Sequence, residues 1–157
     1  MNVLFVGYGK MGGALGDAWL ASGWVKQLVA IDPSLPQGTQ AQVIAGVSQL
    51  QQTRFDLVVV AVKPAMAAQV IESLPAGLWD HAVLVSVMAG VSCAELAKAS
   101  GGQAPVVRAM PNTPVMVNRG CTGLFSDTLV DESQRDLIRN LFAAVGVAVW
   151  VDSEEQM

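Results

Sequence analysis

The stretch that decides the fold runs from residue 3 to residue 12 and reads VLFVGYGKMG. Its apolar start predicts a strand, its glycines follow the spacing Gly7-x-Gly9-x-x-Gly12, and a helical pattern of apolar residues comes next. In such a unit the first glycine makes the tight turn, the second lets a pyrophosphate approach the backbone, and the third lets helix and strand pack closely. Free N–H groups at the start of the helix would hold the phosphates. We therefore expect this turn to bind a dinucleotide, the alternative being a glycine-rich turn without a ligand.

Short apolar runs alternate with helical patterns along the rest of the chain. Most of these runs are continuously hydrophobic, which is typical of parallel strands that are covered on both faces. Because parallel strands need crossover helices, the sequence predicts an α/β fold with a doubly wound, mostly parallel Rossmann-type sheet. The runs predict strands over residues 3–6, 28–31, 57–62, 83–87, 106–109 and 147–151.

Apolar stripes and capping residues place helices between these strands. A stripe from Met11 to Trp19 predicts the first helix, and Gly23 is its expected end. Pro64 suits the first residue of a second helix, whereas the stretch 33–52 has only a weak helical pattern. Two further helices are expected to start at capping boxes, Ser92 with Glu95 and Asp131 with Gln134.

The composition excludes several other classes of protein. Of 157 residues, 52% are hydrophobic and 14% charged, which is enough apolar material for the packed core of one domain. No apolar run approaches the ~18–20 residues that span a bilayer, and the N-terminus lacks the basic flank of a signal peptide. The net charge of −4 argues against nucleic acid, and one histidine with two distant cysteines predicts no metal site. We expect a cytoplasmic protein with neither nucleic acid nor membrane as a partner.

Asp32 ends the second predicted strand, 20 residues beyond Gly12. A carboxylate at this place can accept hydrogen bonds from the ribose hydroxyls of NAD and would repel the 2′-phosphate of NADP. The alternative is structural, because Asp32-Pro33-Ser34 is also good turn chemistry. We interpret Asp32 as a ribose ligand that favours NADH.

Two other polar segments follow strands, and ligands of doubly wound folds bind at the carboxyl ends of strands. Lys63 ends the long apolar run 57–62, although a solvated lysine at a strand end is an equally good interpretation. Asn112 and Thr113 stand between two prolines after the strand 106–109. Their uncharged donors and acceptors suit a carboxamide, the alternative being a rigid loop that supports the next element.

Four segments together resemble the cofactor domain of pyrroline-5-carboxylate reductase: GYGKMGG (7–13), AVKP (61–64), SVMAGVS (86–92) and VRAMPNTPVMVNRGCTGL (107–124). Their order and spacing extend the resemblance over the whole chain. The resemblance implies reduction of 1-pyrroline-5-carboxylate, a cyclic imine, to L-proline with NADP or NAD in its reduced form. It also implies a homo-oligomer, a dimer or higher, for the full-length protein.

The resemblance and the glycine motif together imply one set of cofactor-binding residues. Relatives often carry small polar or basic residues where Asp32 stands and use NADPH, so the usual preference need not hold here. No catalytic residue and no metal ligand is expected in this chain. The expected cofactor-binding residues are Gly7, Tyr8, Gly9, Lys10, Met11, Gly12, Asp32, Ser48, Ala61, Val62, Lys63, Pro64, Ala89, Gly90, Asn112, Thr113 and Pro114.

The last residues, Ser153-Glu154-Glu155-Gln156, have the pattern of an N-cap with its box partner directly after a strand. We therefore expect residues 1–152 to form the dinucleotide-binding domain. Residues 153–157 are then the start of a helical dimerisation and substrate domain that this chain otherwise lacks, which would leave the chain alone inactive. Two alternatives are another two-domain reductase, of the β-hydroxyacid dehydrogenase type, and a non-catalytic NAD(P)-sensing module.

Overall fold

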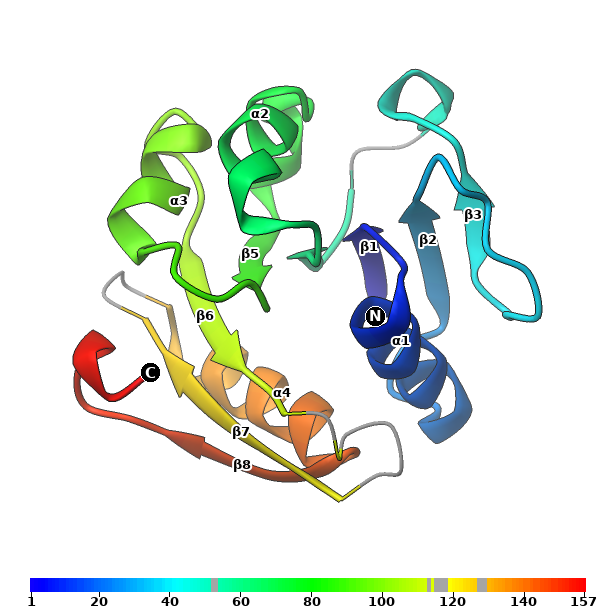
Figure 1. The fold of residues 1–157 in the computed structure, drawn as a ribbon. Coiled ribbons are helices and arrows are strands. Elements are labelled where there is room, and N and C mark those ends of the chain that lie inside the picture. Colours follow the sequence, from blue (N-terminus) through cyan, green and yellow to red (C-terminus); the bar gives the residue numbers. More distant parts are fainter. Residues whose placement is uncertain (52–53, 113, 115–118, 127–129) are drawn as a thin grey trace.

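The computed structural model describes residues 1–51, 54–112, 114, 119–126 and 130–157. Within them, eight strands form one sheet in the order β3-β2-β1-β4-β5-β6-β7-β8 (Figure 1). The strands are β1 (Asn2–Val6), β2 (Gln27–Ile31), β3 (Gln42–Ile44), β4 (Leu57–Val60), β5 (Val83–Ser86), β6 (Val106–Met110), β7 (Gly120–Phe125) and β8 (Gly146–Trp150). The helices are α1 (Lys10–Ser22), α2 (Ala67–Glu72), α3 (Cys93–Ala99) and α4 (Glu132–Ala143), with 3-10 turns η1 (Val47–Gln49), η2 (Pro64–Met66), η3 (Ala76–Asp80) and η5 (Glu154–Gln156).

Neighbouring strands run parallel, except β6 and β7, which are antiparallel. Strand β1 lies between β2 and β4, and its last residue, Val6, pairs with Ile31 on one side and Val60 on the other. The chain builds β2 and β3 on one side of β1 and then crosses to β4 on the other, so the strand order reverses beside β1. These observations confirm the predicted doubly wound, mostly parallel Rossmann-type sheet.

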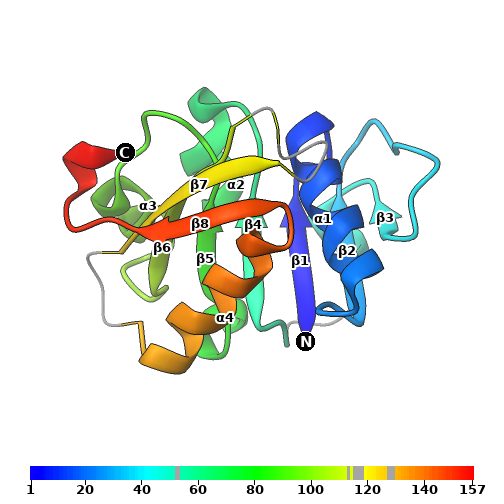
Figure 2. The same cartoon turned by 90° about the horizontal axis from the view of Figure 1, so that it is seen from below.

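Helices cover both faces of the sheet, α1 and α4 on one face and α2 and α3 on the other (Figure 2). On the first face the buried rings of Trp19 and Phe142 meet edge to face with centroids 5.5 Å apart. The indole N–H of Trp19 also donates to the Leu141 carbonyl at 2.8 Å, which joins α1 to α4. On the second face, Ile71 of α2 and Leu96 of α3 are buried. The continuous apolar strands are thus explained by burial on both sides.

The predicted helix ends are confirmed where their capping residues are described. Gly23 ends α1 in the left-handed conformation, with φ of +82°, and its N–H donates to the Leu20 carbonyl. The Ser92 hydroxyl accepts the N–H of Glu95 at the start of α3. Asp131 and Gln134 form a reciprocal capping box at the start of α4.

Several boundaries differ from the prediction for local physical reasons. Strand β4 ends at Val60 because the chain bends away from the sheet before Lys63. The helix predicted from Pro64 starts as the 3-10 turn η2 and continues as the six-residue helix α2. The weakly patterned stretch 33–52 contains the short strand β3, which was not predicted because its residues are half-polar. It pairs with β2, and the Asp32 N–H extends that pairing by donating to the Ile44 carbonyl at 2.9 Å.

Strand β8 and the segment after it also differ from what the sequence pattern predicts. Strand β8 alternates, with Val147 and Val149 exposed at 61% and 50%, because it is an edge strand that α4 covers on one face only. The predicted helix after residue 153 is the single turn η5, whose Gln156 side-chain oxygen accepts the N–H of Ser153. A domain boundary at residue 152 stays a prediction. No helix within the described residues is long and apolar enough to cross a membrane.

Gly12 is the point at which α1 packs against the sheet. A Cβ added there would lie 2.7 Å from the Gly7 carbonyl oxygen and 3.3 Å from the Cβ of Ala61. The first contact is with backbone, which cannot rotate away as a side chain can. A side chain at residue 12 would therefore push α1 away from the turn after β1.

Gly12→Ala is expected to lower the free energy of unfolding by about 1–3 kcal/mol because of this overlap. Gly13→Ala is the matched control on the same helix, since its Cβ would come no closer than 3.6 Å to another group. Alanine in a helix is also favoured over glycine by up to about 1 kcal/mol, so the control is expected to be neutral or stabilising. Urea unfolding measures both. Equal stabilities of the two variants would contradict the close packing at Gly12.

Candidate functional site

The carboxyl ends of the parallel strands meet at one edge of the sheet, and the predicted site segments follow them there (Figure 1). Thr113 lies outside the described residues, and the remaining predicted residues can be placed. Gly7 to Gly12 follow β1, Asp32 follows β2, Ser48 lies in η1 after β3, Ala61 to Pro64 follow β4, Ala89 and Gly90 follow β5, and Asn112 and Pro114 follow β6.

The turns after β1 and β4 are in direct contact. Gly7 has a φ of +91°, and a Cβ on it would lie 2.5 Å from the Ala61 carbonyl oxygen, so only glycine fits. Backbone hydrogen bonds fix the same two turns. The Gly7 N–H donates to the Ile31 carbonyl at 2.9 Å, and the Ala61 N–H donates to the Val6 carbonyl at 2.8 Å. The structure therefore brings the glycine loop and the segment 61–64 together, as the site requires.

The start of α1 is open. Gly9 is its N-cap residue, and neither a side-chain cap nor an acidic residue is present in its first turn. A Cβ on Gly9 would meet nothing within 4 Å, in contrast to Gly7 and Gly12 on either side. The first N–H groups of a helix have no partner within the helix, and they carry the positive end of its dipole. This helix start can therefore bind an anionic group that approaches Gly9.

Tyr8 has a role that the sequence motif did not indicate. Its side chain is 3% exposed, packs edge to face on Phe5, and donates from Oη to Asp17 at 2.8 Å. Burial, and then the bond to Asp17, raises the pKa of the Tyr8 phenol far above its usual value, so the hydroxyl stays protonated. The Tyr8 side chain thus anchors the glycine loop in the core. The periodic apolar pattern of α1 gave no sign of this polar contact at Asp17.

Asp32 stands beside the glycine loop with both carboxylate oxygens engaged. Oδ2 accepts the Tyr8 N–H at 2.9 Å, and Oδ1 accepts the N–H and hydroxyl of Ser34 at 2.9 and 2.7 Å. Burial raises the pKa of Asp32, but the bonds from Ser34 and Tyr8 outweigh it and hold the pKa below its ordinary value. The predicted turn is therefore present, and the carboxylate is a fixed negative charge. A carboxylate has about four acceptor positions, which leaves capacity for a hydroxyl ligand.

The other predicted residues are less closely connected. Lys63, Ala89 and Gly90 are exposed at the edge, and so is Ser48 in η1. Asn112 uses its side-chain oxygen to accept the Cys121 N–H at 2.9 Å, which ties the loop after β6 to β7. In the described part of the chain, no hydrogen bond joins these side chains to the glycine loop.

The structure contains a buried ion pair that the sequence analysis did not predict. Nη1 of Arg108, on β6, lies 2.8 Å from Oε1 of Glu154, on η5, and the Arg108 side chain is 9% exposed. The signal was present, since Arg108 is a charged residue inside the apolar run VVRAM. Among the described residues, no group of three or more His, Cys, Asp or Glu side chains could hold a metal ion.

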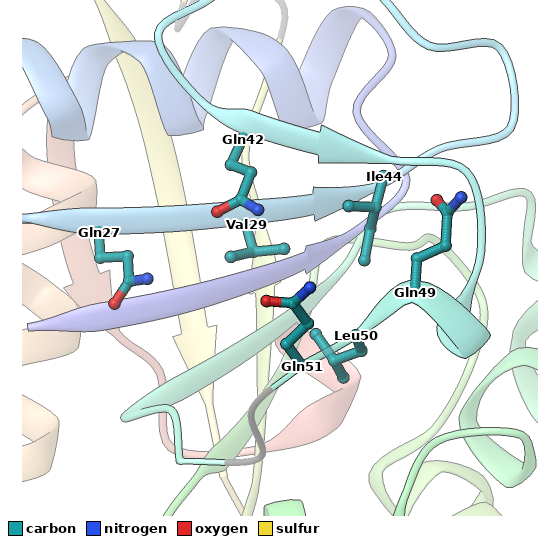
Figure 3. Close-up of a pocket in the computed structure, with 7 residues that line it drawn as sticks. All are labelled: Gln27, Val29, Gln42, Ile44, Gln49, Leu50 and Gln51. Carbon is teal, nitrogen blue, oxygen red and sulfur yellow. The ribbon is translucent and has the colours of Figure 1, made fainter.

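A pocket of about 240 Å³ lies on β2, β3, η1 and the segment after η1 (Figure 3). Four glutamines line it with three apolar residues, and none of the seven is charged or belongs to the predicted site. Its neutral lining offers no counter-charge to phosphate groups. The lining residues are Gln27, Val29, Gln42, Ile44, Gln49, Leu50 and Gln51.

Comparisons with known proteins agree with this geometry. Residues 2–90 match the family model described as NADP oxidoreductase, coenzyme F420-dependent. The chain is 33% identical to pyrroline-5-carboxylate reductase of Pseudomonas aeruginosa, over 99% of this chain and 59% of that protein. Among solved structures, Plasmodium falciparum pyrroline carboxylate reductase with NADP bound has a TM-score of 0.88 at 25% identity, covering 99% of this chain and 59% of that one. The Coxiella burnetii pyrroline-5-carboxylate reductase has a TM-score of 0.84 at 30% identity, with coverage of 99% and 60%. The chain thus spans about three-fifths of the length of these relatives.

Proposed function

Because this chain belongs to the family described as NADP oxidoreductase, coenzyme F420-dependent, we propose that it is the cofactor-binding part of a pyrroline-5-carboxylate reductase. The proposed reaction is reduction of 1-pyrroline-5-carboxylate to L-proline, the last step of proline biosynthesis. The observation that carries the proposal is the open start of α1 at Gly9, beside the ionised Asp32.

The residues present fit a pyridine dinucleotide. The pyrophosphate is doubly anionic, and the uncapped N–H groups of α1 together with the open space at Gly9 suit it. Asp32 is anionic and held beside the loop, where it suits the hydroxyls of the adenosine ribose. Both features were predicted from the sequence, and their roles toward a cofactor stay part of this proposal. We extend it to the whole set of 17 residues named above, Thr113 included.

In this proposal the chain binds and orients, and the reduced nicotinamide supplies the hydride when it is bound. The start of α1 fixes the pyrophosphate, and Asp32 fixes the ribose on the adenine side. The loops after β4, β5 and β6 would border the remaining length of the cofactor. Holding the reactants in place supplies much of the rate of such a transfer, so rigid loops at this edge matter more than an added acid.

The proposal also covers partners and location. We expect the complete enzyme to act on a small imine as a homo-oligomer in the cytoplasm, without nucleic acid. These expectations rest on the proposed biosynthetic role.

Gly9→Ala is expected to abolish dinucleotide binding while the fold stays intact. The added methyl group would meet no atom of the described residues within 4 Å, but it would project into the space proposed for the pyrophosphate. Calorimetric titration with NADH and with NADPH measures the affinity, and thermal unfolding checks the fold. Gly13→Ala is the control on the same helix. Unchanged affinity in Gly9→Ala would contradict the assignment of this loop.

NADH is expected to be preferred or at least accepted. The fixed charge of Asp32 would face the 2′-phosphate of NADPH, at a cost of about 1–3 kcal/mol, or roughly 5- to 150-fold in affinity. Asp32→Ser and the size-matched Asp32→Asn are expected to reduce the preference. Asp80→Asn is the control, since it removes the same charge from η3, at the opposite ends of the strands. If the unmodified chain binds NADPH tens of times more tightly, Asp32 does not select the cofactor.

The reaction itself is tested by an assay for proline formation from 1-pyrroline-5-carboxylate and each cofactor. We expect the 157-residue chain alone to bind cofactor without turnover. A chimera that adds the C-terminal part of the Pseudomonas aeruginosa reductase after residue 157 is expected to form proline, and to lose that activity with Gly9→Ala. Comparable proline formation by the chain alone would contradict the division between cofactor and substrate parts.

A further inference from the structure

We propose that Arg108 and Glu154 are positioning residues that hold the loops at the nicotinamide end of the cofactor, a role that rests on the proposed function. Neither is among the residues expected to touch the cofactor. They act through the loop 87–92 after β5 and through residues 111–112, which directly follow β6.

One carboxylate oxygen joins three distant segments of the chain. Oε1 of Glu154 accepts a hydrogen bond from Nη1 of Arg108 at 2.8 Å and another from the Cys93 N–H at 2.7 Å. Arg108 belongs to β6, Cys93 is the first residue of α3, and Glu154 begins η5. The turn η5 lies beside α3 in both overall views (Figures 1 and 2). Glu154 therefore fastens the segment after β8 to β6 and to the start of α3.

A contribution to the free energy of unfolding explains this ion pair poorly. Arg108 lies between the fully buried Val107 and Ala109, and its Nε is buried without a hydrogen-bond partner among the described residues. Taking a cation out of water is costly, and well-packed apolar residues often replace a buried ion pair without loss of stability. What an ion pair adds is a fixed geometry between the groups that it joins.

Both ends of this pair adjoin the proposed site. Cys93 directly follows the loop 87–92, which contains Ala89 and Gly90. The Ser92 hydroxyl accepts the N–H of Glu95, and Glu154 accepts the N–H of Cys93. The end of this loop is therefore bound both by its own capping residue and by a residue from the segment after β8. Arg108 lies four residues before Asn112 on the same chain. Loss of the Glu154 carboxylate would remove one hydrogen bond at the end of the loop 87–92 and one at the Arg108 side chain together.

The pair lies far from the adenine side in the order of strands. Asp32 and Ser48 follow β2 and β3, whereas β6 is separated from β1 by β4 and β5. Its effect should therefore be confined to the nicotinamide end. This asymmetry distinguishes positioning from a general loss of stability, which would weaken both ends equally.

The test compares the binding of NADH with that of ADP-ribose, which lacks the nicotinamide ring. Glu154→Ala is expected to weaken NADH about tenfold while ADP-ribose changes less than twofold. Glu155→Ala is the matched control, since Glu155 is the exposed neighbour and makes no ion pair within the described part of the chain. It is expected to bind both ligands as the unmodified chain does.

Glu154→Ala alone leaves the buried Arg108 guanidinium without its ion-pair partner, so a second variant removes that charge as well. Arg108→Met with Glu154→Ala replaces the pair by apolar groups, so this double variant is expected to unfold at a temperature close to that of the unmodified chain. It is still expected to bind NADH about tenfold more weakly, with ADP-ribose unchanged. If the folded double variant binds NADH normally, or if both ligands weaken by the same factor, the positioning role is overturned. If the unmodified chain binds neither ligand, the proposed function fails, and the positioning role fails with it.

Discussion

The contact on which the site depends is between two turns, one after β1 and one after β4. Gly7 lies so close to the Ala61 carbonyl that a side chain is excluded. Gly12 has no side chain either, which lets α1 pack closely against the same turn. Strand β1 is the central strand at which the sheet reverses its order, so these turns bring both halves of the sheet to one point. The start of α1 is left open there because no side chain of the described residues caps it, and a Cβ on Gly9 would meet none of their atoms within 4 Å. The proposed anion site is thus a consequence of close backbone packing.

Carboxylates fix the two ends of this site. Asp32 holds the glycine loop through the Tyr8 N–H and its own turn through Ser34. Glu154 holds the opposite side through Arg108 and the first N–H of α3. In each case an acidic side chain accepts hydrogen bonds from backbone N–H groups at a loop, which restricts the positions that the loop can take. Such restricted loops would suit the proposed role of this site, which is to hold a long, flexible cofactor in one orientation.

Much of this arrangement could be predicted from the sequence. The continuous apolar strands, the glycine spacing and the capping residues are local patterns, because burial and helix capping act over a few residues. The pattern held for the central strands and for the Asp131 capping box, whereas Ser92 and Glu95 form only half of their box and β8 is exposed on one face. Strand β3 could not be predicted, since its short, half-polar sequence is a strand only through pairing with β2. The Tyr8 to Asp17 bond and the Arg108 to Glu154 pair were also missed. The Arg108 to Glu154 pair joins residues that are 46 positions apart in the sequence, and the Tyr8 to Asp17 bond joins a loop to the helix after it. Periodicity carries no information on such contacts.

The most direct test of the central claim is an NMR titration of the chain with NADH that follows each backbone amide. If the cofactor lies at the open start of α1, the largest shifts occur in residues 7–12 and 61–64, with smaller ones in 87–92. The amides of Gln27 and Gln42, which line the glutamine-lined pocket at the starts of β2 and β3, then stay unaffected. Saturable shifts centred on that pocket, with the glycine loop unchanged, would contradict the account.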